Sequence, residues 1–339
     1  MRILLVIPQY HHEERSRQTA RTQRLEAGLV QADHDVSVVT GKWWGQSSPT
    51  HHHRWTTHYA AGRSKLSAPR VANQIRQHDP DVVHLVDVPP VVVAVASMVT
   101  DAPLVYEATG FDSPLGRSRF AERLTRYIDE IIVPSEVIET TMLARGISGT
   151  TTTLPDPIHI DLIESVSPIS GVDLVWSADS LTDAHLEDLL LALAELDSTA
   201  WSTVILLESD IDQAIEEIDT YDLLDQIDIL QQPTRRERVA VYRGADIFVQ
   251  TANHCRFATE LLWAMGAGCI GLVQYQPESS AHNLVTEHNY GVRVSNPDDL
   301  VSGFHEASEL PTSDFEPYFS RYDVSTIVGQ LTGRYRRLL

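Results

Sequence analysis

Hydrophobic and polar positions follow two successive series of short apolar runs and longer amphipathic segments. The runs are rich in Val, Ile and Leu, which is typical of strands buried on both faces of a parallel sheet. They cover residues 2–8, 35–40, 81–88, 103–108 and 129–134, and then residues 172–176, 203–207, 246–250 and 269–273. Helical patterns cover residues 15–30, 117–127, 235–243 and 259–265. Strands that alternate with helices predict an α/β protein with doubly wound parallel sheets.

Residues 245–273 carry the clearest prediction of a ligand site. An apolar strand is followed by the polar loop 251–258, by a helix that closes at Gly266 and Gly268, and by a further strand. In doubly wound sheets, ligands bind where the carboxyl ends of strands meet the amino ends of helices. The loop 251–258 is therefore a candidate ligand site.

A turn-forming segment, Leu154-Pro155-Asp156-Pro157, separates the two series. Two prolines around an aspartate suit a stiff hinge. We expect one domain over residues 1–154 and a second that begins at residue 155.

Composition narrows the class of protein. The chain has 339 residues, 42% of them hydrophobic, and no apolar run long enough to span a membrane, so we expect a cytoplasmic protein of two ordinary domains. We find no secretion signal, which disfavours a two-domain solute-binding protein. The two cysteines, Cys255 and Cys269, have neither the spacing of a zinc site nor that of a disulfide framework.

The net charge of −21 is unevenly distributed. Residues 1–150 contain 16 acidic and 16 basic residues, so the second half carries the whole imbalance, and only Lys42 and Lys65 are lysines. An acidic, lysine-poor surface suits a salt-accumulating cytoplasm, where dense carboxylates stay solvated and repulsion is screened. It also disfavours nucleic acid as a partner, because that needs a net basic face.

Several segments resemble motifs of the retaining glycosyltransferases of family 4, which have the GT-B fold of two Rossmann-like domains facing a cleft. Residues 245–250 resemble the family's strand "ADVFVLPS", and WAMGAG at 263–268 resembles "EAMAxG". Residues 80–84 resemble "PDVVH", and 153–157 resemble the connector "VIPNG". The resemblance spans nearly the whole chain. It implies a donor-side domain over residues 155–319, with a helix over 297–307, and a closing helix within 320–339 that packs back on the first domain.

The chain departs from the family at the residues that hold the donor. The two family glutamates fall on Cys255 and Trp263, and the Arg and Lys that neutralise the diphosphate fall on Asp179 and Ala184. No Lys or Arg occurs between residues 146 and 234.

The resemblance implies a glycosyltransferase that moves a hexose-type sugar from a nucleotide sugar to a lipid-linked or glycan acceptor, with no metal and no cofactor. Since the family glutamates are missing, the alternative is a catalytically inactive partner or chaperone of another glycosyltransferase. Glu260 lies one helical turn before Trp263 and is the candidate for the sugar contact. The candidate site comprises catalytic Glu260 and Glu107, donor-binding Arg256, Phe257, Thr259, Ser280 and His282, and acceptor-side Tyr10, His11 and His12.

Residues 36–78 contain basic but no acidic side chains, interleaved with three tryptophans. Cations beside aromatic rings suit an anionic lipid surface, where each base contributes about 1 kcal/mol. The sequence leaves two interpretations open: a peripheral contact with the inner face of the cell membrane, or a mobile acceptor-side loop followed by a basic helix.

Overall fold

The computed structural model describes residues 1–10, 17–45, 48–54, 56–62, 66–118, 120–182, 184–196, 201–286, 290–311 and 317–339. The chain divides into two compact units. Unit 1 comprises Met1–Pro157 together with Val324–Leu339, and unit 2 comprises Ile158–Asp323. The chain therefore crosses between the units twice, at Pro157 and at Asp323.

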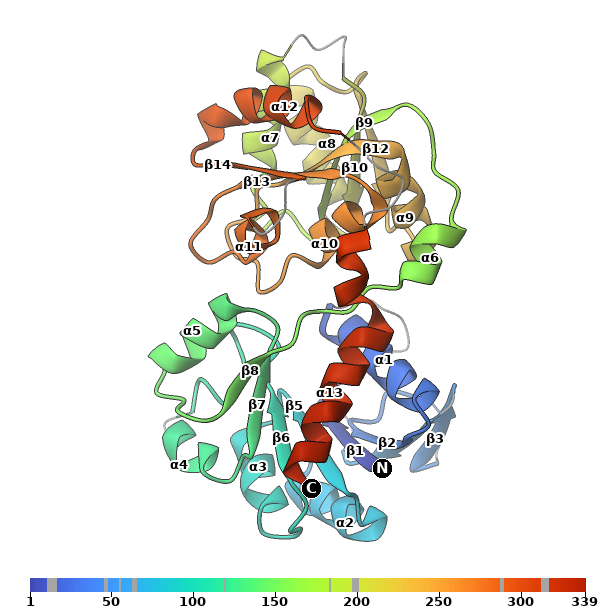
Figure 1. Cartoon of the computed structure of the whole chain (residues 1–339), viewed down its shortest axis with the longest axis vertical. Helices are drawn as coiled ribbons and strands as arrows, with labels where there is room; N and C mark the ends of the chain where they lie inside the picture. Colours follow the sequence, from blue (N-terminus) through green and yellow to red (C-terminus); the bar gives the residue numbers. More distant parts are fainter. Residues whose placement is uncertain are drawn as a thin grey trace. The chain divides into compact units, whose positions relative to one another are not determined.

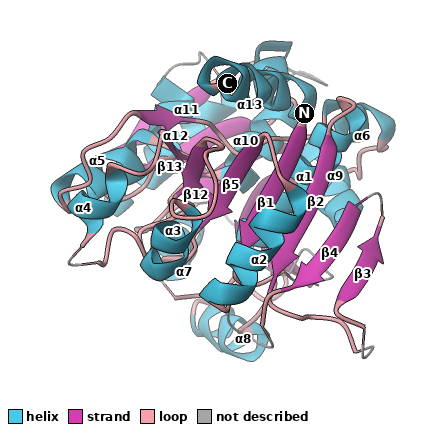
Figure 2. Ribbon diagram, turned by 90° about the horizontal axis from the view of Figure 1, so that it is seen from below, coloured by secondary structure: helices cyan, strands magenta, loops and turns pink. Residues whose placement is uncertain are grey.

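Unit 1 is built on a sheet whose described strands have the order β3-β4-β2-β1-β5-β6-β7-β8. All neighbouring strands are parallel except β3 and β4, which form an antiparallel hairpin at one edge. The strands are β1 (Arg2–Ile7), β2 (Asp35–Thr40), β3 (Thr50–His53), β4 (Thr56–Ala60), β5 (Val82–Val86), β6 (Leu104–Glu107), β7 (Glu130–Val133) and β8 (Thr151–Thr153). Figure 2 shows β1, β2, β4 and β3 side by side, with α2 lying across one face.

Helices cover both faces of this sheet. Their bounds are α1 (Arg17–Gln31), α2 (Ala68–His78), α3 (Pro90–Ala96), α4 (Ala121–Thr125), α5 (Glu136–Ala144) and α13 (Val324–Leu338). Apolar residues of α1 and α13 pack on one face, and those of α2, α3 and α5 pack on the other. In Figure 1, α13 runs beside α1, although almost 300 residues separate the two helices in the sequence. A Cβ at Gly28 of α1 would lie 2.6 Å from Cγ2 of Val328, so this pair of helices needs a residue without a side chain.

Unit 2 contains an entirely parallel sheet with the described order β11-β10-β9-β12-β13-β14. The strands are β9 (Val172–Ala178), β10 (Thr203–Leu207), β11 (Ile227–Gln231), β12 (Ala245–Gln250), β13 (Ile270–Gln274) and β14 (Gly291–Val294). The α-helices are α6 (Ile160–Ser165), α7 (Leu186–Glu195), α8 (Ile211–Thr220), α9 (Arg235–Gly244), α10 (Thr259–Ala267), α11 (Ala281–Thr286) and α12 (Leu300–Ser308). The short 3-10 helices are η2 (Pro297–Asp299) and η3 (Pro317–Tyr322).

Helix α10 is the centre of this unit. All nine of its residues are buried, because α6, α9, η3 and the sheet surround it. It ends where Gly268 adopts a left-handed conformation with φ of 114°, a conformation in which glycine is favoured. Helices α7, α8 and α12 cover the opposite face of the sheet.

The doubly wound α/β prediction is confirmed for both units. Two local expectations differ from the structure. The helix expected over 117–127 is described only as α4, and the segment that one of the two open interpretations takes as a mobile loop contains β3 and β4. His and Thr side chains give that hairpin a polar sequence, yet its backbone groups pair along the sheet edge. Within the described ranges, no helix has both the length and the apolar character needed to cross a bilayer.

Candidate functional site at the carboxyl edge of unit 2

The carboxyl ends of parallel strands meet at one edge of the unit 2 sheet, and polar residues gather there. Ser177 lies at the end of β9, and Glu208 follows β10 directly. Three residues separate the end of β11 from the start of α9, and Glu260 lies in the first turn of α10, after β12. The topology therefore brings together residues that are more than 80 positions apart in the sequence.

The start of α9 is fixed by a capping box. The Thr234 side chain accepts a hydrogen bond from the Glu237 backbone N–H, and the Glu237 carboxylate accepts one from the Thr234 backbone N–H. This reciprocal pair satisfies two N–H groups that a helix start leaves without partners. Arg235 and Arg238 follow at once, so both guanidinium groups are presented at the edge where the strands end.

Glu260 receives hydrogen bonds from both arginines and from a tyrosine. Arg235 Nη1 donates to Glu260 Oε1 and Oε2 at 2.9 and 3.0 Å, and Arg238 Nη1 approaches Oε2 at 3.4 Å. The Tyr242 hydroxyl donates to Oε2 at 2.6 Å. Burial raises the pKa of Tyr242, and the neighbouring Glu260 charge adds to the shift. The Glu260 side chain is thus held by α9.

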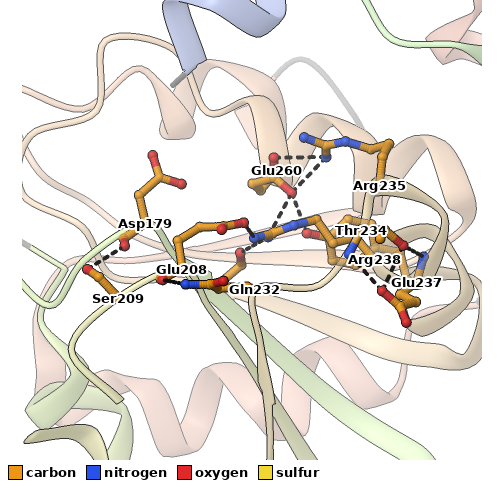
Figure 3. Close-up of polar contacts among 11 residues, drawn as sticks. Asp179, Glu208, Ser209, Gln232, Thr234, Arg235, Glu237, Arg238 and Glu260 are labelled. Atoms are coloured by element: carbon orange, nitrogen blue, oxygen red, sulfur yellow. Dashed lines mark hydrogen bonds and ion pairs between the residues drawn. The ribbon is translucent and has the colours of Figure 1, made fainter. Parts of the chain in front are cut away.

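Arg238 lies between two carboxylates (Figure 3). Besides Glu260, its guanidinium contacts Glu208 through Nη2 and donates to Ser177 Oγ from Nη1 at 2.8 Å. Burial disfavours the charged form, but the charge of Glu260 and the contacts with Tyr242 and Glu208 together outweigh it, so the pKa of Arg238 is raised. Arg235 also lies over the indole ring of Trp263, 5.0 Å from its centroid, which is a cation–π contact.

Sequence reasoning overlooked both arginines. It searched the loops after β9 and β10, where the family carries its cations, and treated residues 235–243 only as a helix. The signal was available: a helix that starts directly after a strand places its first turn at the ligand edge. The Thr234 to Glu237 capping pattern marks that start.

The predicted donor-binding residues lie in the two loops that precede α10 and α11 and in the first turns of these helices. Phe257, Thr259 and Ser280 are buried, and Arg256 and His282 are half-buried. Ser280 Oγ accepts a hydrogen bond from the Ala258 backbone N–H at 3.2 Å, which joins the two loops at the start of α10. The His282 ring meets that of Tyr275 edge-on. The roles assigned to these residues stay predictions.

Glu107 lies in a different environment, inside unit 1, and is almost fully buried. Arg21 Nε donates to one of its oxygens, and His84 Nε2 lies 2.9 Å from the other. Burial favours the neutral acid, but the Arg21 charge and the hydrogen bond from His84 outweigh it and lower the pKa of Glu107 to about 2. A catalytic role for Glu107 stays a prediction.

The same network holds the connector and the last helix. Arg21 Nη1 donates to Asp156 at 2.8 Å, and its Nη2 donates to the Leu154 carbonyl at 2.9 Å. His84 Nδ1 contacts the Tyr335 hydroxyl of α13. Segments next to both chain crossings are therefore anchored to the core of unit 1.

In unit 1, which the sequence predicts to be the acceptor side, Tyr10 is buried, and its hydroxyl donates to Glu26 at 2.7 Å. His11 and His12 lie outside the described residues. A residue that the sequence reasoning did not single out is Asp87, which follows β5 with a positive φ of 44°. Its carboxylate accepts hydrogen bonds from the Thr109 backbone N–H and hydroxyl, and burial raises its pKa.

The tryptophans of residues 36–78 that the structure describes pack against other rings. Trp44 is buried, and Trp43 is half-buried. Trp43 stacks on Tyr10 with ring centroids 5.8 Å apart. Further described rings beside Trp43 include those of Trp44, His51, His53 and His58. Trp55 lies outside the described residues.

Among the residues that the structure describes, no group of three or more His, Cys, Asp or Glu side chains is arranged to hold a metal ion. Both cysteines are buried, and burial raises the pKa of the Cys269 thiol.

The two parallel-sheet units define a GT-B protein, as solved structures of the same fold show. A glycosyltransferase from Rickettsia africae matches with a TM-score of 0.79 at 13% identity, over 99% of this chain and 98% of that one. Sucrose-phosphate synthase from Thermosynechococcus elongatus matches at 0.74 and 16%, over 99% and 98%. Anabaena HepE in complex with UDP-glucose matches at 0.74 and 16%, over 99% and 100%.

One family model matches part of the chain. Residues 18–162 match the family model described as Glycosyltransferase Family 4. This match, which covers part of the chain, agrees with the resemblance seen in the sequence motifs. No curated protein matches the chain.

Proposed function

We propose that the protein is a glycosyltransferase that transfers a hexose-type sugar from a nucleotide-sugar donor to a lipid-linked or glycan acceptor. The observation that carries the proposal is the position of Arg235 and Arg238 at the carboxyl edge of the unit 2 sheet. A GT-B transferase needs positive charge there to stabilise the departing diphosphate. These two side chains supply cations that residues 146–234 do not contain.

The solved relatives support the class of donor. HepE has been crystallised with UDP and with UDP-glucose. We therefore propose a UDP-sugar as the first donor to test. Arg238 contacts the diphosphate, Arg256 and His282 lie on the same side of the donor, and Phe257, Thr259 and Ser280 shape the pocket at the start of α10.

We propose that Glu260 is a positioning residue. Glu260 fixes the two arginines and reaches the donor sugar only through them. On the acceptor side, Asp87, Tyr10 and Glu107 belong to unit 1, and Asp87 is our candidate for contacting the acceptor hydroxyl because it is half-buried, whereas Tyr10 and Glu107 are buried.

The experiment that tests the proposal is isothermal titration of UDP and of a panel of nucleotide sugars into the protein in high salt, followed by turnover with the donor that binds. The proposal expects binding of at least one nucleotide sugar and transfer or slow hydrolysis of its sugar.

The alternative, an inactive partner of another glycosyltransferase, has one observation in its favour. Both arginines are already paired with carboxylates, so a diphosphate could bind them only if a carboxylate moved away. Absence of any nucleotide binding, together with loss of glycosylation in cells when association with another transferase is disrupted, would favour the partner.

Membrane association stays a prediction. Trp43 and Trp44 pack against rings of the protein itself. We therefore expect the basic side chains of residues 36–78 to make the contact with lipid headgroups. Sedimentation with anionic liposomes at several salt concentrations tests it, because a contact of this kind weakens as salt rises.

A further inference from the structure

We propose that Glu208 is a displaceable counter-ion, which occupies Arg238 until the diphosphate of the donor takes its place. This inference rests on the proposed function and adds to it how the site is kept closed to other anions. Of the two described carboxylates that contact Arg238, that of Glu208 has the fewer other contacts.

The three charged side chains differ sharply in exposure. The Arg238 side chain is 4% exposed and that of Glu260 is 9% exposed, whereas that of Glu208 is 42% exposed. A half-exposed carboxylate regains water when it leaves, but a buried guanidinium cannot move without losing its partners. Glu208 is therefore the member of the pair that moves.

The contacts of each group agree with this assignment. Arg238 is held by Ser177 and Glu260, and Glu260 is held in turn by Arg235 and Tyr242. Within the described part of the chain, the Glu208 carboxylate contacts Arg238 alone. Figure 3 shows Glu208 and Glu260 flanking the guanidinium. Departure of Glu208 would leave Nη2 of Arg238 facing solvent without disturbing the rest of the cluster.

The charges favour exchange by an anion. With Glu208 in place, two arginines face two carboxylates, and the cluster is neutral. Without it, the cluster carries one positive charge beside a rigid guanidinium whose N–H groups match the oxygens of a phosphate as well as those of a carboxylate. A diphosphate carries more charge than Glu208 and can reach Arg238 with several oxygens.

The surrounding charge explains why a resident carboxylate discriminates among anions. Unit 2 contains 30 acidic and 7 basic residues between Ile158 and Asp323, a net charge of −23. A simple anion must overcome this field and expel Glu208 with no other contacts. A nucleotide sugar is also held through its nucleoside and sugar, so it can offset that cost.

The test uses three probes, UDP, inorganic pyrophosphate and uridine, and three variants of the full chain. Glu208→Gln removes the competing charge, Arg238→Lys keeps a cation but loses the planar fork, and Glu216→Gln removes an exposed carboxylate elsewhere in unit 2. Binding is measured by isothermal titration at fixed salt, with thermal unfolding as the check that each variant folds.

We expect Glu208→Gln to lower the Kd for UDP and for pyrophosphate by about tenfold, the effect of one charge-assisted contact. Binding of uridine, which has no phosphate, should not change. Glu216→Gln should bind all three probes as the wild type does, and Arg238→Lys should bind UDP and pyrophosphate more weakly. Equal UDP affinity in the wild type and in Glu208→Gln would overturn the inference while leaving the proposed function in place.

The converse result separates the two proposals in the other direction. If Glu208→Gln gains pyrophosphate binding but no variant binds a nucleotide or a nucleotide sugar, Glu208 is a displaceable counter-ion of Arg238, but the donor is not the anion that displaces it and the proposed function fails. If no variant binds any phosphate, both fail.

Discussion

Arg235 donates from one nitrogen to both carboxylate oxygens of Glu260, at 2.9 and 3.0 Å. This pair ties the first turn of α9 to the first turn of α10 at the edge where ligands of parallel sheets bind. Glu260 therefore holds both arginines in place, and we expect its replacement to lower the free energy of unfolding.

Glu260→Gln keeps the shape of the side chain and removes its charge. We expect a loss of about 3 kcal/mol, because buried Arg238 and half-buried Arg235 are left with too little negative charge. For a unit of this size, that lowers the Tm by about 6 to 12 °C. Thermal unfolding measures it, with Glu216→Gln as the exposed control. A variant as stable as the control, but without turnover, would instead support a direct contact of Glu260 with the sugar.

Glu107→Gln should make the protein less sensitive to acid. The pKa of Glu107 is about 2 in the folded chain and lies at 4.5 ordinarily, so its ionised form stabilises the fold above pH 4.5. That contribution is lost as pH falls from about 4.5 towards 2. The Tm difference between wild type and variant should be large at pH 7 and should shrink as the pH falls towards 3. Glu122→Gln, an exposed carboxylate of the same unit, is the control. A difference that does not change with pH would contradict the ionised network.

Binding of UDP should strengthen as salt rises. The net charge of −23 on unit 2 repels a diphosphate, and the range of that repulsion falls from about 10 Å at 0.1 M salt to about 3 Å at 1 M. The contact with buried Arg238 is screened less. Titration of UDP at several salt concentrations between about 0.1 and 1 M shows whether the Kd falls or rises with salt. Binding that weakens steadily with salt would mean that exposed cations dominate the site.

The sequence predicts the two sheets well, because strands such as β1, β9 and β12 are buried on both faces along most of their length and are therefore mostly apolar. The edge hairpin β3–β4 escapes prediction because its residues are polar.

The candidate site is predicted only in part. The strand, loop and helix pattern of residues 245–273 predicts the loop after β12 as a ligand site. The pairing of Glu260 with Arg235 joins residues 25 positions apart on different helices, and that of Arg21 with Asp156 joins residues 135 apart. Side-chain pairs of this kind depend on how helices pack, and hydrophobic periodicity does not specify it.

The measurement that tests the account most directly is the titration of the nucleotide sugar that binds best into the wild type and into Arg238→Gln. The cation at the carboxyl edge of unit 2 is the centre of the proposal, and one charge-assisted contact is worth roughly 1.5 to 3 kcal/mol. We predict that Arg238→Gln raises the Kd by about tenfold to a hundredfold while the protein remains folded. A folded Arg238→Gln variant that binds the donor as tightly as the wild type would contradict the account.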